Sequence, residues 1–385
     1  MIYLDNAATT QVDASVLSSY MDISTQLFGN PSSLHKLGEM SSGLLNQSRK
    51  QIADLMNVYL EEIYFTSGGT EGDNWAIKGT AFEKESFGKH LITSAIEHPA
   101  VLKTMAQLEQ MGWDVTYLPI NQEGVINPSD LKASIRPDTV LVSIMAVNNE
   151  MGSIQPLKAI GDVLKDYPTI HFHVDAVQSV GIMDLDLNHS RIDLAVFSGH
   201  KFHAPKGTGF MYIKKGRKIQ PLLSGGGQEK GGRSGTENVP GNAAMAKALR
   251  LALENTEEKK QHLSHLKDQL VNYLTGFDKV SLFSPKGSSP HIICFGMKQI
   301  KGEVVVHALE KEGIYVSTTS ACSSKRKEQT HSIMGMGYAK EEAETVVRIS
   351  LGYQNNLNDI EAFKQAFAPI YQQLASIYTD HTLGN

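Results

Sequence analysis

Short apolar runs alternate with amphipathic segments from the start of the chain to about residue 216. Apolar residues recur at the spacing of one helix face over 37–56, which predicts a helix. The apolar runs expected to form buried strands lie at 63–66, 90–95, 114–118, 140–146, 170–174, 193–197 and 210–213. Most are separated by enough chain for a crossover helix. This pattern predicts an α/β fold with a mostly parallel, seven-stranded sheet covered on both faces.

The pattern changes after Gly216. A glycine-dense loop occupies 224–236, and one helix is expected through the 240s. A second helix is expected to carry Leu263 through Phe277, and later strands are expected at 292–295, 315–318 and 347–351. We therefore expect a large domain over 15–255. A smaller α+β domain would combine 1–14 with 256–385.

Composition narrows the classes of function. The chain has 385 residues, 41% hydrophobic and 20% charged, with a net charge of −5. The chain has no excess of basic residues, so its composition does not indicate direct nucleic-acid binding. No apolar run reaches the roughly 20 residues of a membrane helix. The first residues lack the features of a signal peptide. Two cysteines cannot build a disulfide framework, so we expect a reducing, cytoplasmic setting and no membrane association.

Polar residues follow several of the predicted strands. In an open parallel sheet the ligand binds at the carboxyl ends of the strands. Lys201 comes just after the strand at 193–197, where a desolvated amine could form a Schiff base with an aldehyde. The glycine-containing run 67–74 leads from a strand into a helical pattern, so it could bind phosphate or simply cap the helix.

Three further strand exits deliver His98, Asn149 and Asp175. Each alone could be a capping residue, but together with Lys201 they indicate a site. His171 and His173 share one strand face, which invites a metal interpretation. No Cys-x-x-Cys or His-Glu-x-x-His accompanies them, so we favour packing and expect no metal.

A set of motifs runs through the chain in a fixed order. They are Asp5-Asn-Ala-Ala-Thr-Thr, Gly29-Asn-Pro-Ser-Ser-Leu-His, Ser67-Gly-Gly-Thr-Glu, Glu97-His-Pro-Ala-Val, Val147-Asn-Asn-Glu-Met-Gly, His173-Val-Asp-Ala-Val-Gln-Ser, Ser198-Gly-His-Lys and Arg233-Ser-Gly-Thr. The chain therefore resembles the cysteine desulfurases, pyridoxal-phosphate enzymes of aminotransferase class V with the aspartate-aminotransferase-like fold type I. The resemblance covers about residues 2–355. Gly69 replaces a frequent Ala, and Gly72-Asp73 replaces the usual Ser-Asn.

The resemblance implies a cofactor, pyridoxal 5'-phosphate, and the residues that bind it. Those residues are Gly69, Thr70, His98, Asn149, Asp175, Gln178, Ser198, His200, Lys201 and Thr236. Lys201 would hold the cofactor covalently and Asp175 would pair with its ring nitrogen, which makes the ring an electron sink. His98 would stack on the ring and could move protons. Thr236 would reach the cofactor phosphate of a second copy, so a homodimer is implied.

The remaining implied roles concern the substrate, L-cysteine. Asn149 would contact both cofactor and substrate, and Arg348 would bind the substrate carboxylate. Cys322 lies in a small-polar stretch followed by basic residues, a setting that favours a thiolate. The match to the family's persulfide loop makes Cys322 the expected nucleophile. Cys294, inside an apolar run, is expected to be core.

Several alternatives remain open at this point. A selenocysteine lyase or an aminotransferase of the same fold would share most of the site, although an aminotransferase would not need Cys322. A scaffold that mainly docks sulphur acceptors is a second possibility, and a nicotinamide dehydrogenase is a third that leaves Lys201 unexplained. The acceptor could be an iron–sulphur scaffold or a tRNA-thiolation enzyme. The sequence does not choose between them.

Overall fold

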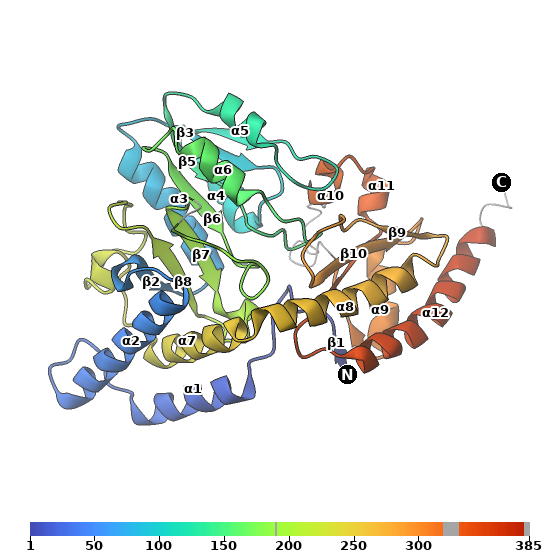
Figure 1. Cartoon of the computed structure of the whole chain (residues 1–385), viewed down its shortest axis with the longest axis horizontal. Helices are drawn as coiled ribbons and strands as arrows, with labels where there is room; N and C mark the ends of the chain where they lie inside the picture. The colour runs from blue at the N-terminus through green and yellow to red at the C-terminus, as the bar shows by residue number, and fades with distance from the viewer. Residues whose placement is uncertain (189–190, 319–330, 381–385) are drawn as a thin grey trace.

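The computed structural model describes residues 1–188, 191–318 and 331–380 (Figure 1). The strands are β1 Ile2–Tyr3, β2 Ile63–Thr66, β3 His90–Ser94, β4 Asp114–Leu118, β5 Thr139–Ser143, β6 His171–Asp175, β7 Leu194–Ser198, β8 Gly209–Ile213, β9 Val280–Leu282, β10 Ile292–Met297, β11 Ile314–Tyr315 and β12 Val346–Ser350. The α-helices are α1 Ala14–Gln26, α2 Lys36–Leu55, α3 Gly69–Lys84, α4 Pro99–Gln110, α5 Pro128–Ser134, α6 Leu157–Leu164, α7 Val239–Leu253, α8 Thr256–Leu274, α9 Gly302–Lys311, α10 His331–Gly335, α11 Lys340–Ala343 and α12 Leu357–Asp380. Short 3₁₀ helices are η1 Leu60–Glu62, η2 Gly199–Lys201 and η3 Glu229–Gly231.

The seven strands predicted between residues 63 and 213 all form and pair into one sheet. Their order is β2-β8-β7-β6-β5-β3-β4. Strands β4, β3, β5, β6 and β7 run parallel, whereas β8 runs antiparallel to both of its neighbours. The predicted mostly parallel, seven-stranded sheet is therefore confirmed.

Helices cover both faces of this sheet because alternate residues on each strand point to opposite sides. On β7, Ala195 and Phe197 pack into the core that includes residues of α2 and α7. Leu194 and Val196 pack on the other side, with Trp75 of α3. Strand β7 is thus apolar at four successive positions and buried throughout, which is why it reads as a continuous apolar run in the sequence. The edge strand β4 differs, because only Leu118 is buried there.

Strand β6 breaks this rule on one side. Phe172 and Val174 belong to the same core as α2 and α7. The alternate positions carry His171, His173 and Asp175, which are buried against the α3 face. The two histidines that invited a metal interpretation therefore pack between the sheet and a helix.

A smaller sheet, in the order β12-β10-β9, is antiparallel. Helices α8, α9 and α12 share one core with it, and Leu4 of the N-terminal segment joins that core. Helices α7 and α8 follow one another along one side of the molecule, from the large sheet toward the small one (Figure 1). Helix α8 ends at Leu274, so the prediction that it extends to Phe277 was one turn too long. Strand β9, only three residues long, was missed.

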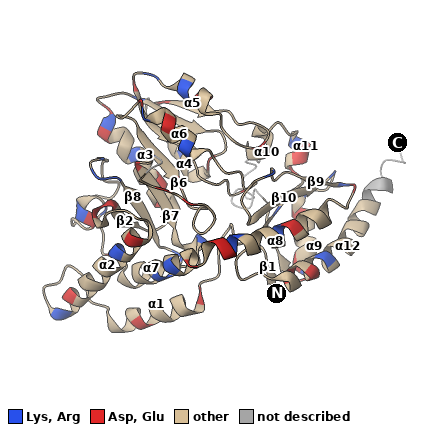
Figure 2. Cartoon of the chain, viewed as in Figure 1, with Lys and Arg blue, Asp and Glu red and all other residues tan. Residues whose placement is uncertain are grey.

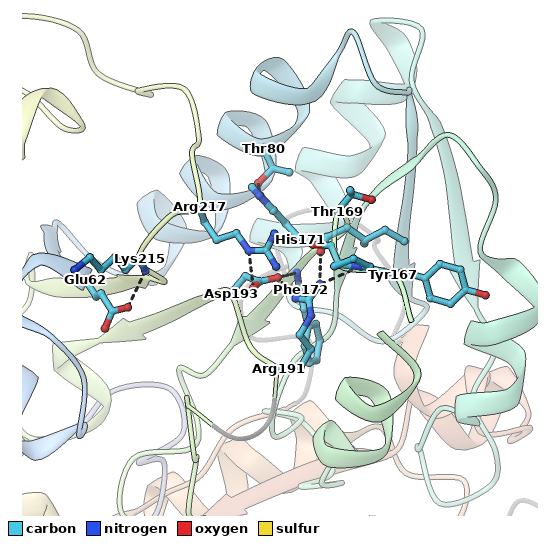
Figure 3. A network of polar contacts seen from close by, with 12 residues as sticks. Glu62, Thr80, Tyr167, Thr169, His171, Phe172, Arg191, Asp193, Lys215 and Arg217 are labelled. Atoms are coloured by element: carbon cyan, nitrogen blue, oxygen red, sulfur yellow. Dashed lines mark hydrogen bonds and ion pairs between the residues drawn. The ribbon is translucent and has the colours of Figure 1, made fainter. Parts of the chain in front are cut away.

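A buried carboxylate links the N-terminal ends of β6 and β7, at the edge of the sheet opposite the candidate site (Figure 3). Asp193 is fully buried and accepts a hydrogen bond from the backbone N–H of Phe172 at 2.9 Å. Arg191 pairs with one oxygen of Asp193, and Nε of Arg217 donates to the other at 2.8 Å. Two guanidinium groups therefore compensate one buried charge, which keeps these strand ends in register.

Charged residues of both signs are interspersed along the surface helices, for example on α8 (Figure 2). Glu257 and Glu258 directly precede Lys259 and Lys260 there. No helix in the described ranges is both long and apolar enough to cross a membrane. The charge distribution thus gives the described surface of α8 no single sign.

Candidate active site

Lys201 lies at the end of η2, directly after the carboxyl end of β7. Its Nζ donates hydrogen bonds to the backbone oxygens of Ala7, at 2.5 Å, and Ala8, at 2.9 Å. Lys201 is half-buried, as expected for an amine presented to a site instead of bulk water. The sequence therefore placed Lys201 correctly at a strand end, but it gave no hint of these two carbonyl partners.

The N-terminal segment is a wall of this site. The backbone oxygen of His200 accepts hydrogen bonds from both N–H and Oγ1 of Thr10, each at 2.9 Å. Nε2 of Gln178 donates to the backbone oxygen of Ala7 at 2.9 Å. The Asp5-Asn-Ala-Ala-Thr-Thr motif is therefore fixed across the turn that carries Lys201. Sequence reasoning recognised this motif and assigned it no role.

Asp175, His98 and Lys201 lie close enough to influence one another electrostatically. Burial raises the pKa of Asp175, and the charges of His98 and Lys201 oppose that rise. Burial lowers the pKa of His98, and Asp175 and Lys201 act on it with opposite signs. The structure thus brings together an amine, a carboxylate and an imidazole that come from three separate segments. Their convergence matches the sequence prediction, while their individual roles remain predictions.

His98 and Asp175 also serve the capping functions that were weighed against catalysis. Nδ1 of His98 accepts a hydrogen bond from the N–H of Ala100 at 3.1 Å and caps α4. One oxygen of Asp175 accepts from the N–H of Val177 at 3.0 Å. Each group keeps another polar atom for a ligand, so capping and ligand binding are compatible here.

Two of the residues implied as cofactor ligands, Gly69 and Ser198, lie at the N-terminus of α3. This helix begins at Gly69, and a Cβ placed there would lie 2.8 Å from Cγ2 of Val177. Gly68 has a φ of +149° and lies next to Ser198. A Cβ placed on Gly68 would lie 3.5 Å from Oγ of Ser198. The missing side chains leave the first N–H groups of α3 open to a close ligand, as phosphate binding requires.

Two further residues implied as cofactor ligands, Thr70 and His200, would contact the phosphate and differ in burial. Thr70 is exposed in the first turn of α3. His200 is half-buried, and its Nδ1 lies 3.1 Å from Oγ1 of Thr9. Burial lowers the pKa of His200 to about 4, with Lys201 and Lys206 adding to the effect, so its imidazole is neutral at pH 7. His200 is therefore a neutral hydrogen-bonding group in the chain without cofactor.

Arg348 joins the small sheet to the site. Its Nη1 donates to the backbone oxygen of Asn149 at 2.8 Å, and its Nη2 donates to Oδ1 of Asp5 at 2.9 Å. Only 4% of Arg348 is exposed, and its buried Nε has no hydrogen-bond partner among the described residues. An unsatisfied buried donor next to a cofactor-type site suits a carboxylate ligand.

The remaining predicted residues have different outcomes. Thr236 is exposed between η3 and α7. Cys322 falls in 319–330, outside the described residues. Cys294 is fully buried on β10, and burial raises the pKa of its thiol, which confirms that it belongs to the core.

These groups fit pyridoxal phosphate by the chemistry of the donor set. An amine for its aldehyde, a buried carboxylate for its ring nitrogen and an open helix N-terminus for its phosphate lie at one edge of the sheet. A domain model described as aminotransferase class-V matches residues 2–363. The chain belongs to this family. The cofactor predicted from the sequence, pyridoxal 5'-phosphate, is that of class-V cysteine desulfurases and is confirmed by this match.

Curated relatives and solved structures agree with the class-V family. A NifS/IcsS protein homolog from Lactobacillus delbrueckii subsp. bulgaricus is 51% identical over 98% of this chain and 99% of its own length. A cysteine desulfurase IscS from Methanosarcina thermophila is 44% identical over 98% of this chain and 93% of its own length. A solved NifS-like protein superposes with a TM-score of 0.92 at 37% identity, covering 96% of this chain and 99% of that one. The predicted family and fold type are thus confirmed.

Sequence reasoning missed three acidic residues around the site. Asp5 holds Arg348, whereas Asp73 and Glu97 lie near Asp175 in the interior. Glu97 precedes His98 in a recognised motif, and Asp73 stood out as a departure from the family pattern. These were the signals available, but neither showed that the carboxyl groups would be buried together.

Proposed function

We propose that this chain is a cysteine desulfurase that converts L-cysteine to L-alanine and carries the sulphur on Cys322 as a persulfide. One observation carries the proposal: Lys201, Asp175 and His98 converge at the carboxyl edge of a class-V sheet. An amine, a carboxylate and an imidazole in mutual reach are what pyridoxal-phosphate chemistry on an amino acid needs.

Pyridoxal phosphate, when bound, supplies an aldehyde for the amine and a ring that withdraws electrons from the substrate α-carbon. Its proposed ligands in this chain are Gly69, Thr70, His98, Asn149, Asp175, Gln178, Ser198, His200 and Lys201, with Thr236 from a second copy. Asp175 would hold the ring nitrogen in its protonated form. The N-terminus of α3 would bind the phosphate through backbone N–H groups.

Lys201 would act as base and acid toward the substrate. Its Nζ, when not bonded to the cofactor, would take the proton from the α-carbon and return a proton during the formation of alanine. Arg348 would bind the substrate carboxylate, and its bonds to Asp5 and to the backbone oxygen of Asn149 would fix the guanidinium plane. His98 would cover one ring face and exclude water.

Cys322 would accept the sulphur. Its thiolate would attack the sulphur atom of the substrate, forming the S–S bond of a persulfide. The C–S bond would break with its electron pair remaining on carbon, and that carbon would take up a proton to give alanine. Neither step needs an external oxidant.

Two variants, with Cys294→Ala as a control, test these assignments. Cys322→Ala should retain the cofactor's visible absorbance and lose sulphide release from L-cysteine, whereas Cys294→Ala should keep both. Lys201→Ala should lose cofactor attachment that borohydride can fix. Undiminished sulphide release from Cys322→Ala would refute the nucleophile, and release restored by a 2-oxo acid would favour the aminotransferase alternative. Assays of the same variants with selenocysteine as substrate test the selenocysteine lyase alternative.

The partners of this reaction follow from the same roles. We place a second copy against the exposed Thr236, which gives a homodimer, and an iron–sulphur scaffold or a tRNA-thiolation enzyme as the sulphur acceptor in the cytoplasm. Thr236→Ala should weaken cofactor binding without changing the fold. Transfer of labelled sulphur from Cys322 to each class of acceptor distinguishes the two.

A further inference from the structure

Strand β6 presents three polar side chains to helix α3. They are His171, His173 and Asp175, spaced two residues apart and therefore on one face of the strand. His171 Nδ1 lies 3.2 Å from Oγ1 of Thr80 (Figure 3). His173 Nε2 lies 3.4 Å from Oδ1 of Asp73. Helix α3 thus supplies a polar partner to each histidine. Asp73, the partner of His173, lies nearer to the N-terminus of α3 than Thr80 does.

Asp73 is a deeply buried acid. Only 1% of Asp73 is exposed, and neither its Oδ1 nor Nε2 of His173 has another hydrogen-bond partner among the described residues. Within the same residues, no lysine or arginine forms an ion pair with Asp73. His173 cannot balance the charge, because burial lowers its pKa to about 3 and leaves the ring neutral. Its Nδ1 lies 2.8 Å from Oγ of Ser143, which fixes the ring.

Two more buried carboxyl groups lie near Asp73. Burial raises the pKa of Asp73 well above its usual range, and the nearby Asp175 and Glu97 add to the rise. Burial also raises the pKa of Glu97 to about 8. Only Asp175 has cations beside it, since His98 and Lys201 oppose the rise of its pKa. Among the three, Asp175 is therefore the group best able to carry a charge.

We propose that Asp73 is a positioning residue that keeps its proton at neutral pH, bonds His173 and leaves the buried negative charge of this region on Asp175. A protonated Asp73 can donate its O–H to Nε2 of His173 and satisfies two atoms that otherwise have no partner. An ionised Asp73 would repel a negative charge on Asp175 and so disfavour the ionised form of Asp175. The inference rests on the proposed role of Asp175 in binding the cofactor.

Infrared difference spectroscopy of the full-length chain detects this proton directly. Between the wild type and Asp73→Asn at pH 7, we expect the loss of a carboxylic-acid C=O band and no loss of carboxylate bands. The loss of carboxylate bands instead would overturn the proposal. This readout needs no cofactor, so its failure is distinguishable from a failure of Asp175 as cofactor ligand.

Cofactor affinity tests the positioning role. Asp73→Asn keeps a neutral hydrogen-bonding group, so its dissociation constant for pyridoxal phosphate should stay within about twofold of the wild type. Asp73→Leu leaves Nε2 of His173 without a polar partner, and the dissociation constant should rise at least about tenfold. The visible absorbance of cofactor-loaded Asp73→Leu should also titrate at a different pH from that of the wild type. Equal affinities of Asp73→Leu and the wild type, or a loss in Asp73→Asn as large as that in Asp73→Leu, would contradict the inference. If Asp73→Leu does not fold, the infrared result decides.

Thr80→Val is the matched control. Thr80 lies two turns further along α3 and contacts the other buried histidine of β6. Its replacement removes a polar contact between the same helix and strand without touching Asp175. We expect lower thermal stability and an unchanged cofactor affinity and visible pH titration. A shift of that titration in Thr80→Val as large as that in Asp73→Leu would show that the effect is structural, and would overturn the proposal.

Discussion

Asp5 and Arg348 form an ion pair at 2.9 Å across 343 residues of chain. Both are largely buried, with exposed side-chain fractions of 18% for Asp5 and 5% for Arg348. The contact ties the N-terminal segment to β12 beside the residues that would hold the cofactor. The same segment also supplies the two carbonyls that bind Lys201. The N-terminus is therefore part of the site.

Asp5→Asn should impair substrate binding more than chemistry. The variant loses a charge-assisted hydrogen bond worth about 1.5 kcal/mol, so Arg348 is less well oriented toward the substrate carboxylate. We expect KM for L-cysteine to rise about tenfold, with a smaller change in kcat, in steady-state assays of alanine formation. Asp13→Asn is the control, because Asn also caps α1 well. An unchanged KM in Asp5→Asn would remove Asp5 from the site.

Gly72→Ala should destabilise the protein. A Cβ at Gly72 would lie 2.5 Å from Cγ1 of Val196, a buried strand residue that cannot swing away. We expect a loss of about 1–3 kcal/mol in urea unfolding. Gly43→Ala, on α2, is the matched control, since nothing lies within 4 Å of its Cβ. That variant should be neutral or stabilised by up to about 1 kcal/mol.

The large fold was predictable because most strands of its sheet are buried at every position. Runs such as Leu194–Ser198 are apolar at successive positions, so neither the helix period nor an alternating pattern competes with the strand interpretation. Strand β9, Val280–Leu282, is short and half-buried, and nothing in its three residues distinguishes it from a loop. The α8 helix was extended to Phe277 because an apolar residue at helical spacing continues the pattern beyond the last turn.

The site was predictable only where chemistry is attached to a strand end. Asp175 ends strand β6 and Lys201 lies three residues beyond the end of β7, and the topology of a parallel sheet brings such positions together. The pairing of Asp5 with Arg348 depends on how the N-terminal segment returns to β12, which no local pattern encodes. Asp73 looks like an ordinary polar residue in the first turns of a helix. Its burial depends on the close approach of α3 to β7 at Gly72.

Glu97 should make stability depend on pH. Burial raises its pKa to about 8, against about 4.3 in the unfolded chain. A raised folded-state pKa means that this contribution to stability is complete below about pH 4.3 and is lost as the pH rises toward 8. Glu97→Gln should therefore reduce the fall in unfolding free energy between pH 5 and 8 by about 1.4 kcal/mol per pH unit.

Chemical denaturation of the cofactor-free chain at several pH values measures the effect of Glu97. Glu312→Gln, which changes an exposed carboxyl group, is the control and should leave the slope as in the wild type. The same slope in Glu97→Gln and the wild type would show that Glu97 is ionised in the folded state.

Glu229→Gln should destabilise the loop that leads to Thr236. Glu229 accepts two hydrogen bonds from Arg49, each at 2.7 Å, and one from the N–H of Phe65. Removing one charge of this buried pair should cost about 3–5 kcal/mol in urea unfolding. The double variant Arg49→Met with Glu229→Met should lose much less, because no buried charge is left unpaired. A larger loss in the double variant would contradict this account.

The fate of the substrate sulphur tests the central proposal most directly. The purified, cofactor-loaded chain is incubated with L-cysteine, digested without reductant and analysed by mass spectrometry. The chain has two cysteines, and Cys294 is buried. The Cys322 peptide is therefore the test and the Cys294 peptide is the control. We predict the mass of one added sulphur atom on the Cys322 peptide, none on the Cys294 peptide and one alanine formed per persulfide. Alanine formation with Cys322 unmodified would contradict the proposed function.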